Sequence, residues 1–428
     1  MFRKAKSPLG NLLEANPNTP LKTVLTNSDL STALRNENQA LFKYFFPESK
    51  DRRVLNELID WALTNKNNTS DDDFIYNRNA TNVLTSTSKK FHQKLYEDGA
   101  LSDKLKSFID DKDYNESPAF SGQFSSILLQ HSRQTNYQFF KDNPNFLKKI
   151  LNHIHLLSYQ RTIIELCSEN LAAITNSQPD KLINDLGVYA SNTYDKNEET
   201  SHGVFSVIDS IISESSEDVI KCFTTNEPFL TKLVDAALKL KKKYVLVDAF
   251  RTLDNLFKTV DPKIKNRIVD KRDIDFKSLK RNDIFKAFAY YPIFWKKGIE
   301  VMTDYFFQDV DKETNLIPNS SFCRSYVNVF KEMPFPDRIY YIEKLRLQDK
   351  IFPFINKVEY NGCIYKLTKA LSRPPKKDES TSLLSPDEKN LLNSENWVML
   401  VFKFKEYYDD FKIKKKEMLG YEKRKSDF

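Results

Sequence analysis

Side chains that could do chemistry are few in this chain and far apart. Two of its five histidines, His153 and His155, stand two positions apart. On a helix that spacing turns the two imidazoles about 200° away from each other, so they cannot share a metal ion there. We expect His153 to flank an apolar face and His155 to face solvent. The other three each stand alone: His92, His131 and His202.

Runs of carboxylates are the next candidates for chemistry. The densest is Asp71-Asp72-Asp73, which could indicate a cation site. It lacks the alternating ligand spacing and the glycine of a calcium loop, and it follows a stretch of Asn, Thr and Ser. We therefore interpret residues 65–73 as a solvated loop, and Glu198-Glu199 and Asp409-Asp410 likewise as solvated pairs.

Sequence motifs of the common enzyme classes are absent. The chain has no G-x-G-x-x-G, no G-x-x-x-x-G-K-[ST], no H-E-x-x-H and no G-x-S-x-G, and its eight glycines are scattered singly. The sequence therefore predicts a protein that is not an enzyme, without catalytic residues, a metal site or a cofactor.

The charge balance bears on the class of partner. Sixty-six Lys and Arg against 59 Asp and Glu give a net charge of +7, which is mild for 428 residues. Opposite charges are interleaved, whereas nucleic-acid binding usually needs a basic patch, so we disfavour nucleic acid as the main partner. The exception is a basic run from Lys412 to Lys425. It is compatible with a solvated helix end, a nuclear-import or acidic-partner patch, or a nucleic-acid contact.

Hydropathy and cysteine usage bear on the compartment. No stretch approaches the roughly 20 apolar residues that span a bilayer, and the first residues have no apolar signal region. We expect no membrane segment and a cytoplasmic protein, with the nucleus as a further possibility. The four cysteines form no C-x-x-C pair, which is typical of reduced, buried thiols: Cys167, Cys222, Cys323 and Cys363.

Two matching stretches indicate how these side chains are positioned. Asn143–Leu151 and Asn226–Val234 both place apolar residues at i, i+1, i+4 and i+5, which is one face of a helix. A second match lies upstream of each, at Gly122-Gln123-Phe124-Ser125 and Gly203-Val204-Phe205-Ser206. The offset of about 83 residues is twice the roughly 40–47 residues of an armadillo or HEAT unit. These matches predict that one helical unit is used twice.

Composition agrees with a helical chain of several cores. Glycine is scarce and phenylalanine abundant, with 8 and 32 residues, and 428 residues exceed what one compact core usually holds. We predict an all-α, armadillo- or HEAT-like solenoid over residues 1–371, a flexible linker over 372–384, and a C-terminal helix with a basic tail over 385–428. The one strand signal is a hairpin over Val358–Leu367, around Asn361-Gly362.

An aromatic cluster ends at Trp295 and surrounds Pro292. Most of it should be core packing between two helices that meet at this proline. A partly exposed subset could anchor a partner, because Trp and Tyr are enriched at binding hot spots. The candidates are Tyr291, Phe294 and Trp295.

The resemblance to a known family is carried by several stretches, taken in order: Met1–Lys4, Leu12–Glu14, Leu25–Leu30, Leu34–Leu41, Phe120–Asn170, Phe288–Pro292, Phe322–Arg324, Trp397 with Phe402, and Leu419-Gly420. Together they resemble the SAPS family, the Sit-associated regulatory subunits of type-six-like serine/threonine protein phosphatases. The likeness touches most of the chain thinly, and order and spacing carry it rather than any single motif. After Pro292 the chain departs from the family, with Ile293-Phe294-Trp295-Lys296-Lys297, so it looks like a short, divergent member.

The resemblance implies a non-catalytic regulatory or scaffold subunit. It would bind a serine/threonine phosphatase catalytic subunit and direct it to substrates, with further regulatory subunits as possible partners. Asn38 matches a recurring family asparagine and joins the aromatic residues as a candidate partner contact. The alternative is a helical-repeat adaptor for other proteins, such as a transport or trafficking scaffold.

Overall fold

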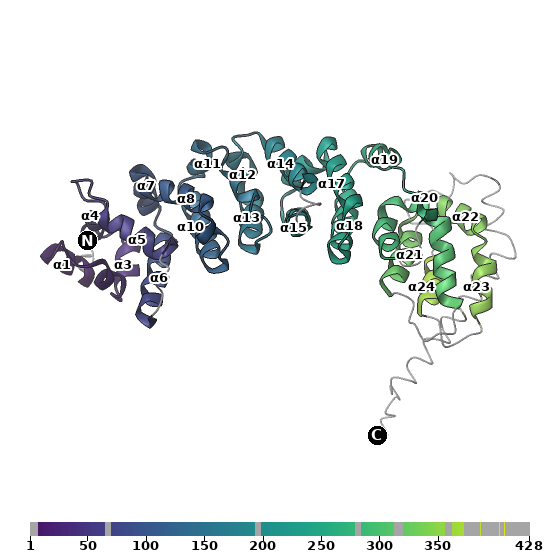
Figure 1. The fold of residues 1–428 in the computed structure, drawn as a ribbon, viewed down its shortest axis with the longest axis horizontal. Helices are drawn as coiled ribbons and strands as arrows, with labels where there is room; N and C mark the ends of the chain where they lie inside the picture. Colours follow the sequence, from purple (N-terminus) through teal and green to yellow (C-terminus); the bar gives the residue numbers. More distant parts are fainter. Residues whose placement is uncertain are drawn as a thin grey trace, which may run out of the picture. The chain divides into compact units, whose positions relative to one another are not determined.

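The computed structural model describes residues 7–64, 70–192, 198–278, 284–311, 320–355 and 362–371, together with the single residues 386, 402 and 406. Within these ranges the chain is all-helical and contains no strand (Figure 1). It divides into two compact units, Met1–Ile268 (unit 1) and Val269–Phe428 (unit 2). The predicted linker at 372–384 lies outside the described residues, as does nearly all of 385–428, so that part of the predicted domain division stays a prediction.

Unit 1 is a succession of short and medium-length helices joined by brief turns. It begins with α1 (Pro8–Ala15), α2 (Leu21–Leu25), α3 (Leu30–Arg35), α4 (Gln39–Phe45), α5 (Arg53–Leu63), α6 (Asp71–Leu84), α7 (Lys89–Asp98), α8 (Ala100–Asp110) and α9 (Lys112–Asn115). It continues with α10 (Pro118–Gln134), α11 (Gln138–Asp142), α12 (Phe146–Leu151), α13 (Leu157–Ile174), α14 (Pro179–Asn192), α15 (Glu198–Glu214), α16 (Glu217–Thr224), α17 (Glu227–Lys239) and α18 (Lys243–Phe257). Helix α19 (Pro262–Asp270) begins in unit 1, and its last two residues belong to unit 2.

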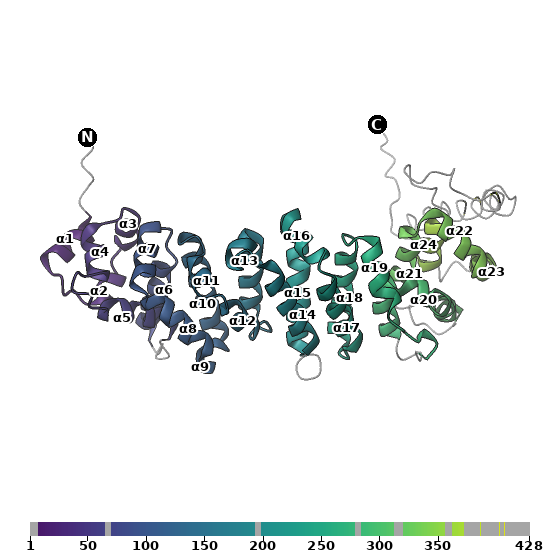
Figure 2. The same ribbon diagram turned by 90° about the horizontal axis from the view of Figure 1, so that it is seen from above.

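Ten of the helices in unit 1 pack in two rows, each helix mainly against its neighbours in the row and across to the other row (Figures 1 and 2). The first row runs α5, α8, α12, α14, α17 and the second runs α6, α10, α13, α15, α18. The core lies between the rows. Helix α5 illustrates why: Leu55, Leu58, Ile59 and Ala62 recur at helical spacing and are all buried.

The two matching sequence stretches occupy equivalent places in these rows. Their Phe-Leu faces belong to α12 and α17 of the first row, and Phe146, Leu147, Phe229 and Leu230 are buried as predicted. The upstream matches lie on α10 and α15 of the second row. In both rows, the helix that carries the second copy therefore lies two helices further along than the helix that carries the first.

The aspartate run belongs to a helix, so the predicted loop over 65–73 is wrong at its end. Ser70 accepts a hydrogen bond from the Asp73 amide and caps α6, and Asp71, Asp72 and Asp73 form its first turn. Carboxylates are favourable there because the helix dipole is positive at its N-terminus. A helix start with three acids therefore resembles a polar loop in sequence.

The helix predicted to hold His153 and His155 is also interrupted. Helix α12 ends at Leu151 and α13 begins at Leu157, so both histidines lie in the turn between the rows. Their ring centroids are 6.4 Å apart. The expected helical separation of the two side chains is therefore wrong.

Unit 2 packs around a kinked helix. It contains the 3-10 turn η1 (Phe276–Ser278) and the helices α20 (Ile284–Asp311), α21 (Ser320–Glu332), α22 (Phe335–Lys344), α23 (Leu347–Ile355) and α24 (Gly362–Leu371). Helix α20 includes Pro292 and departs from helical geometry at Phe294, with φ −104° and ψ 18°. A proline removes one backbone donor and crowds the preceding turn, so the two predicted helices form one bent helix.

The hairpin predicted over Val358–Leu367 is wrong in its second half. Residues 362–371 form α24, which packs against α21 and buries Ile364, Leu367, Ala370 and Leu371. That i, i+3, i+6, i+7 pattern is helical. Asn361, the first residue of the expected turn, lies outside the described residues.

Candidate partner-binding surface

Asn38 has a structural role in unit 1, at the start of α4. Its side-chain oxygen accepts a hydrogen bond from the Leu41 amide at 3.1 Å and caps α4. Its amide group also lies against Gly10 of α1, where any side chain larger than hydrogen would collide with it. Capping typically stabilises a helix by about 1 kcal/mol, which accounts for an asparagine here. A contact between Asn38 and a partner stays a prediction.

Of the three aromatic candidates in unit 2, Trp295 is the one with a described side chain that is partly exposed. Phe294 is 1% exposed and belongs to the core, and the Tyr291 side chain lies outside the described residues. The Trp295 ring is partly exposed and packs edge-on against Tyr341 at 5.5 Å between centroids. Tyr340 beside it is 52% exposed. Helices α20 and α22 therefore bring together an aromatic patch that the sequence alone did not assemble.

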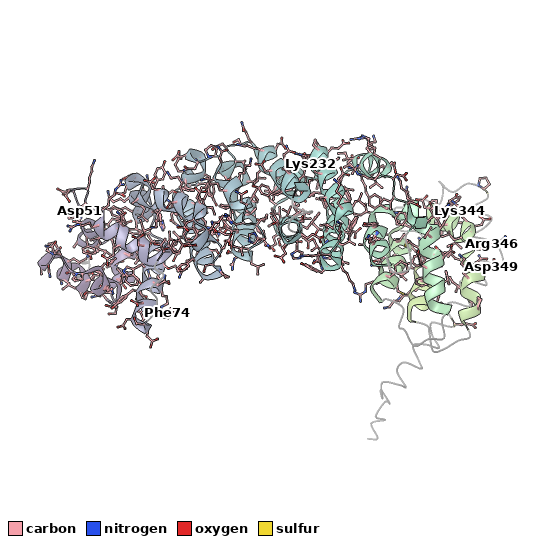
Figure 3. All side chains as sticks on the ribbon, viewed as in Figure 1. Asp51, Phe74, Lys232, Lys344, Arg346 and Asp349 are labelled. Atoms are coloured by element: carbon pink, nitrogen blue, oxygen red, sulfur yellow. The ribbon has the colours of Figure 1, made fainter. Side chains whose placement is uncertain are left out.

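Lysines border this aromatic patch. The Lys296 amine lies 5.5 Å from the Trp295 ring centroid, and the Lys344 amine lies 5.9 Å from that of Tyr341. Lys344 also pairs with Glu300 at 2.9 Å, and it is labelled in Figure 3. Cations over aromatic faces are mildly attractive, so the patch combines ring surface with positive charge.

Unit 1 contains a buried pair of histidines that the sequence did not predict. His92 of α7 and His131 of α10 are fully buried, with their Nδ1 atoms 3.2 Å apart. His92 Nε2 donates to the Ser86 carbonyl at 2.8 Å, so its Nδ1 accepts from His131 Nδ1. His131 Nε2 then has no partner among the described residues. Thirty-nine residues separate the two histidines, and no spacing signal marks the pair.

Electrostatics keep both of these histidines neutral. Burial lowers the pKa of His92 to about 4, against a smaller opposing effect of its hydrogen bond to Ser86. Burial, with a smaller contribution from His92, lowers the pKa of His131 to about 3. Among the described residues no group of three or more His, Cys, Asp and Glu could hold a metal ion. The pair is therefore a core feature with a pH-dependent cost.

Two of the four cysteines match their prediction. Cys167 and Cys323 are buried free thiols, and burial raises the pKa of Cys167 to about 12. Cys222 is a free thiol at intermediate exposure.

In the described part of the chain no helix is both long and apolar enough to cross a membrane.

Two hollows border α5, near the N-terminal end of unit 1. One of about 990 Å³ lies between α1, α2, α4 and α5, and one of about 660 Å³ continues along α5 to Lys104 of α8. They share Arg53 and Glu57, so we treat them as one α5 groove. Its walls carry both charge signs and aromatic surface, from Glu14, Lys43, Tyr44, Asp51, Arg53, Glu57, Asp60, Trp61 and Lys104.

The floor of the α5 groove is fixed by specific contacts. Tyr44 is 8% exposed and donates a hydrogen bond to the Thr19 carbonyl at 2.8 Å, and burial raises its pKa to about 12. Trp61 packs edge-on against Tyr76 at 5.3 Å, and the Lys22 amine lies 5.0 Å from the Trp61 ring centroid. Along the groove, charged side chains of both signs therefore lie beside the Trp61 ring.

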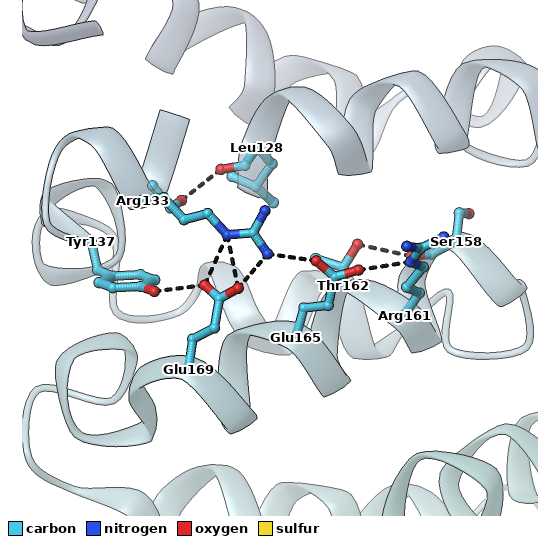
Figure 4. Close-up of polar contacts among 9 residues, drawn as sticks. Leu128, Arg133, Tyr137, Ser158, Arg161, Thr162, Glu165 and Glu169 are labelled. Carbon is cyan, nitrogen blue, oxygen red and sulfur yellow. Dashed lines mark hydrogen bonds and ion pairs between the residues drawn. The ribbon is translucent and has the colours of Figure 1, made fainter. Parts of the chain in front are cut away.

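A second polar cluster joins two helices of the second row (Figure 4). Arg133 Nε of α10 donates to both carboxylate oxygens of Glu169 on α13, at 2.8 and 2.9 Å, and Arg133 Nη2 donates to Glu165 at 2.6 Å. The Tyr137 hydroxyl donates to Glu169 at 2.7 Å, and Arg161 donates to Glu165 at 2.7 Å. Each carboxylate therefore has an arginine partner, so the cluster fastens two helices together.

The charges in this cluster act on the pKa of Glu165. The pKa of Glu165 lies below its ordinary value: partial burial acts to raise it, but hydrogen bonds from Arg161 and Arg133 outweigh that effect. The hydrogen bond to Glu169 raises the pKa of Arg133. Elsewhere in unit 1, exposed apolar side chains include Phe74 at 57% (Figure 3) and its neighbour Ile75 at 37% on α6, and Leu157 at 79% on α13.

No protein-family model, no curated protein and no solved structure matches this chain. The resemblance to the SAPS family is therefore untested and stays a prediction.

Proposed function

We propose that this protein is a non-catalytic regulatory or scaffold subunit that binds a serine/threonine protein phosphatase catalytic subunit and directs it to substrates. The observation that carries the proposal is the order of SAPS-like stretches along the chain. The densest of them, Phe120–Asn170, spans α10 to α13, in the middle of both rows of unit 1. A shared helical framework rather than a shared active site would account for the likeness.

We also propose that unit 1 is an armadillo- or HEAT-like repeat structure. Support comes from contacts that join different helix pairs of the second row at one spacing: Gln123 of α10 donates to Asn77 of α6, and Asn255 of α18 donates to Asp209 of α15 at 3.1 Å, both over 46 residues. In the first row Asn226 donates to Asp180 over the same 46 residues. Armadillo and HEAT units measure roughly 40–47 residues.

The α5 groove is the part of unit 1 best suited to the phosphatase partner. It carries both signs of charge, and its half-buried Trp61 lies among charged residues, as anchors of protein interfaces do. The Trp295 patch of unit 2 offers a second, smaller contact. The catalytic metals and the residues that hydrolyse phosphate would belong to the partner.

Affinity purification of the tagged chain with mass spectrometry tests the proposal. A serine/threonine phosphatase catalytic subunit should be enriched repeatedly. The double variant Glu57→Lys/Asp60→Lys reverses charge in the α5 groove and should reduce that enrichment at least about tenfold. The new lysines would face the partner's positive charges, and like charges placed together across an interface cost several kcal/mol. The control Glu97→Lys/Glu214→Lys makes the same charge change at exposed positions outside the groove and should keep it.

The same experiment separates the alternative, an adaptor for other partners such as a transport or trafficking scaffold. Stacked helices alone do not favour either reading, because both use an extended surface without catalytic groups. Repeated enrichment of trafficking proteins without any phosphatase would exclude the first proposal. A fluorescent fusion tests the proposed cytoplasmic location and whether the basic run of residues 412–425 adds a nuclear pool.

A further inference from the structure

A polar pocket of about 360 Å³ lies on unit 1 apart from the α5 groove. It is bounded by the end of α2, by α3, by α6 and by the turn that leads into α7. Segments about 50 residues apart in sequence meet here, and Asn79 fixes their junction by donating to the Leu25 carbonyl at 2.8 Å. The lining consists of Leu25, Thr26, Asn27, Ser28, Leu30, Ser31, Leu34, Arg35, Asn79, Asn82, Val83, Ser86, Thr87 and Ser88.

The charge of this lining is of one sign. Arg35 is its single ionised residue, and no Asp or Glu contributes to it. The exposed Arg35 side chain makes no hydrogen bond or ion pair with another described residue. The nearest acids in sequence are engaged elsewhere: Asp29 accepts hydrogen bonds from the Ser7 hydroxyl and the Leu9 amide, and Glu37 pairs with Lys90 at 3.5 Å. The guanidinium is therefore available to an external anion.

Uncommitted hydrogen-bond donors surround Arg35. The hydroxyls of Ser28, Ser31 and Thr87 and the side-chain amide of Asn82 bond to no other described residue. The Ser86 hydroxyl is buried and has no partner either. A group with several acceptor oxygens and a negative charge would satisfy a guanidinium and neighbouring hydroxyls together. A cation would find no carboxylate here.

The floor of the pocket is apolar and its volume is small. Leu25, Leu30, Leu34 and Val83 are all buried, between 1% and 6% exposed. A volume of about 360 Å³ lies at the lower end of the roughly 300–1,000 Å³ of ligand pockets. It suits one modified side chain with its immediate neighbours rather than a dinucleotide-sized cofactor.

We propose that this pocket binds a phosphorylated serine or threonine side chain of a partner protein, with Arg35 as the pairing cation. The anion assignment stands on the lining alone. The choice of a protein as the source rests on the proposed function, because a phosphatase scaffold meets phosphorylated substrates. The pocket would hold such a substrate, or a phosphorylated regulatory segment, beside the catalytic subunit.

The test uses the purified full-length chain without any phosphatase. Its probes are two fluorescent peptide pools with randomised flanks around a central serine, one pool phosphorylated and the other not. Fluorescence anisotropy should detect binding of the phosphorylated pool, which should weaken as salt rises. Arg35→Gln should weaken it about tenfold or more, as expected for loss of a charge-assisted pair. Arg78→Gln, an exposed arginine on α6 outside the lining, is the matched control and should bind as the wild type does.

Equal binding of the two pools, or unchanged binding by Arg35→Gln, would overturn the proposal. Competition separates the two sources of the anion. If inorganic phosphate or free phosphoserine displaces the peptides at the peptides' own concentration, the pocket takes a small anion and the protein assignment fails. Phosphopeptide binding without phosphatase enrichment would instead leave the pocket standing and remove the phosphatase proposal. Circular dichroism of each variant verifies that it is folded.

Discussion

At the scale of single residues, the buried pair of His92 and His131 sets a pH limit on unit 1. Both side chains are neutral in the folded protein because burial depresses their pKa values, to about 4 and about 3. In the unfolded chain each histidine takes up a proton below about pH 6.5. The unfolded state therefore binds more protons in acid, and stability is full above pH 6.5 and falls as the pH drops toward 4.

The corresponding prediction concerns denaturant unfolding at pH 7.5 and pH 5.0. Below pH 6.5 each of the two histidines should lower the free energy of unfolding by about 1.4 kcal/mol per pH unit. Carboxylates lower it further in acid, as a separate effect. His131→Leu removes one of the two groups, so its loss between the two pH values should be smaller than that of the wild type by about 2 kcal/mol. An equal loss in both proteins would mean that His131 does not stay neutral in the fold.

Gly203 supplies a second prediction at this scale. A Cβ atom at this position of α15 would overlap the backbone carbonyl of Ile154, which cannot move aside as a side chain could. Gly203→Ala should therefore destabilise the protein by about 1–3 kcal/mol, the usual cost of overpacking. Its counterpart Gly122→Ala on α10 has open space and should be neutral or stabilising by up to about 1 kcal/mol. Urea midpoints measure both, and equal effects would contradict the packing account.

The sequence predicted some residue roles and could not predict others. The Phe-Leu faces of α12 and α17 were predictable because burial follows helical periodicity. Asn38 was picked out for another reason, although an asparagine three residues before Leu41 is also a recognisable cap signal. The His92–His131 pair and the Arg35 pocket were out of reach, because their members come from separate helices. No local spacing records which helices become neighbours.

At the scale of elements, the Arg133 cluster allows the coupling between two neighbouring helices of a row to be measured. Arg133 and Glu169 join α10 to α13 through three hydrogen bonds, and both side chains are about one-third exposed. Solvent screens such a pair, so a double-mutant cycle of Arg133→Ala and Glu169→Ala should give a coupling of about 0.5–1 kcal/mol. The coupling should shrink in high salt. A coupling of zero would mean that apolar packing alone fixes the two helices.

Helix positions were predicted better than helix ends, and the misassigned elements share a cause. The pattern of Phe146–Asn170 fits one long helix, yet the chain turns after Leu151 so that α13 joins the second row. A short turn barely disturbs the period of apolar residues, so periodicity alone does not reveal it. The same limit applies at Asp71–Asp73, where a helix start and a polar loop share a composition.

At the scale of the whole molecule, the division at Ile268 predicts that unit 1 folds without unit 2. Helices in unit 1 pack against near neighbours in their rows, and such structures tolerate truncation between units. A fragment of residues 1–268 should give a helical circular dichroism spectrum and a cooperative thermal transition. A fragment that is unfolded, while the full chain is folded, would show that the two units depend on each other.

The central claim is that the chain binds a phosphatase catalytic subunit. Its most direct test mixes the purified full-length chain with a purified type-six-like serine/threonine phosphatase catalytic subunit and measures binding by isothermal titration calorimetry. We predict saturable binding that Glu57→Lys/Asp60→Lys weakens and Glu97→Lys/Glu214→Lys preserves, with no phosphatase activity from the chain alone. No heat of binding from a folded chain, across catalytic subunits of this class, would contradict the claim.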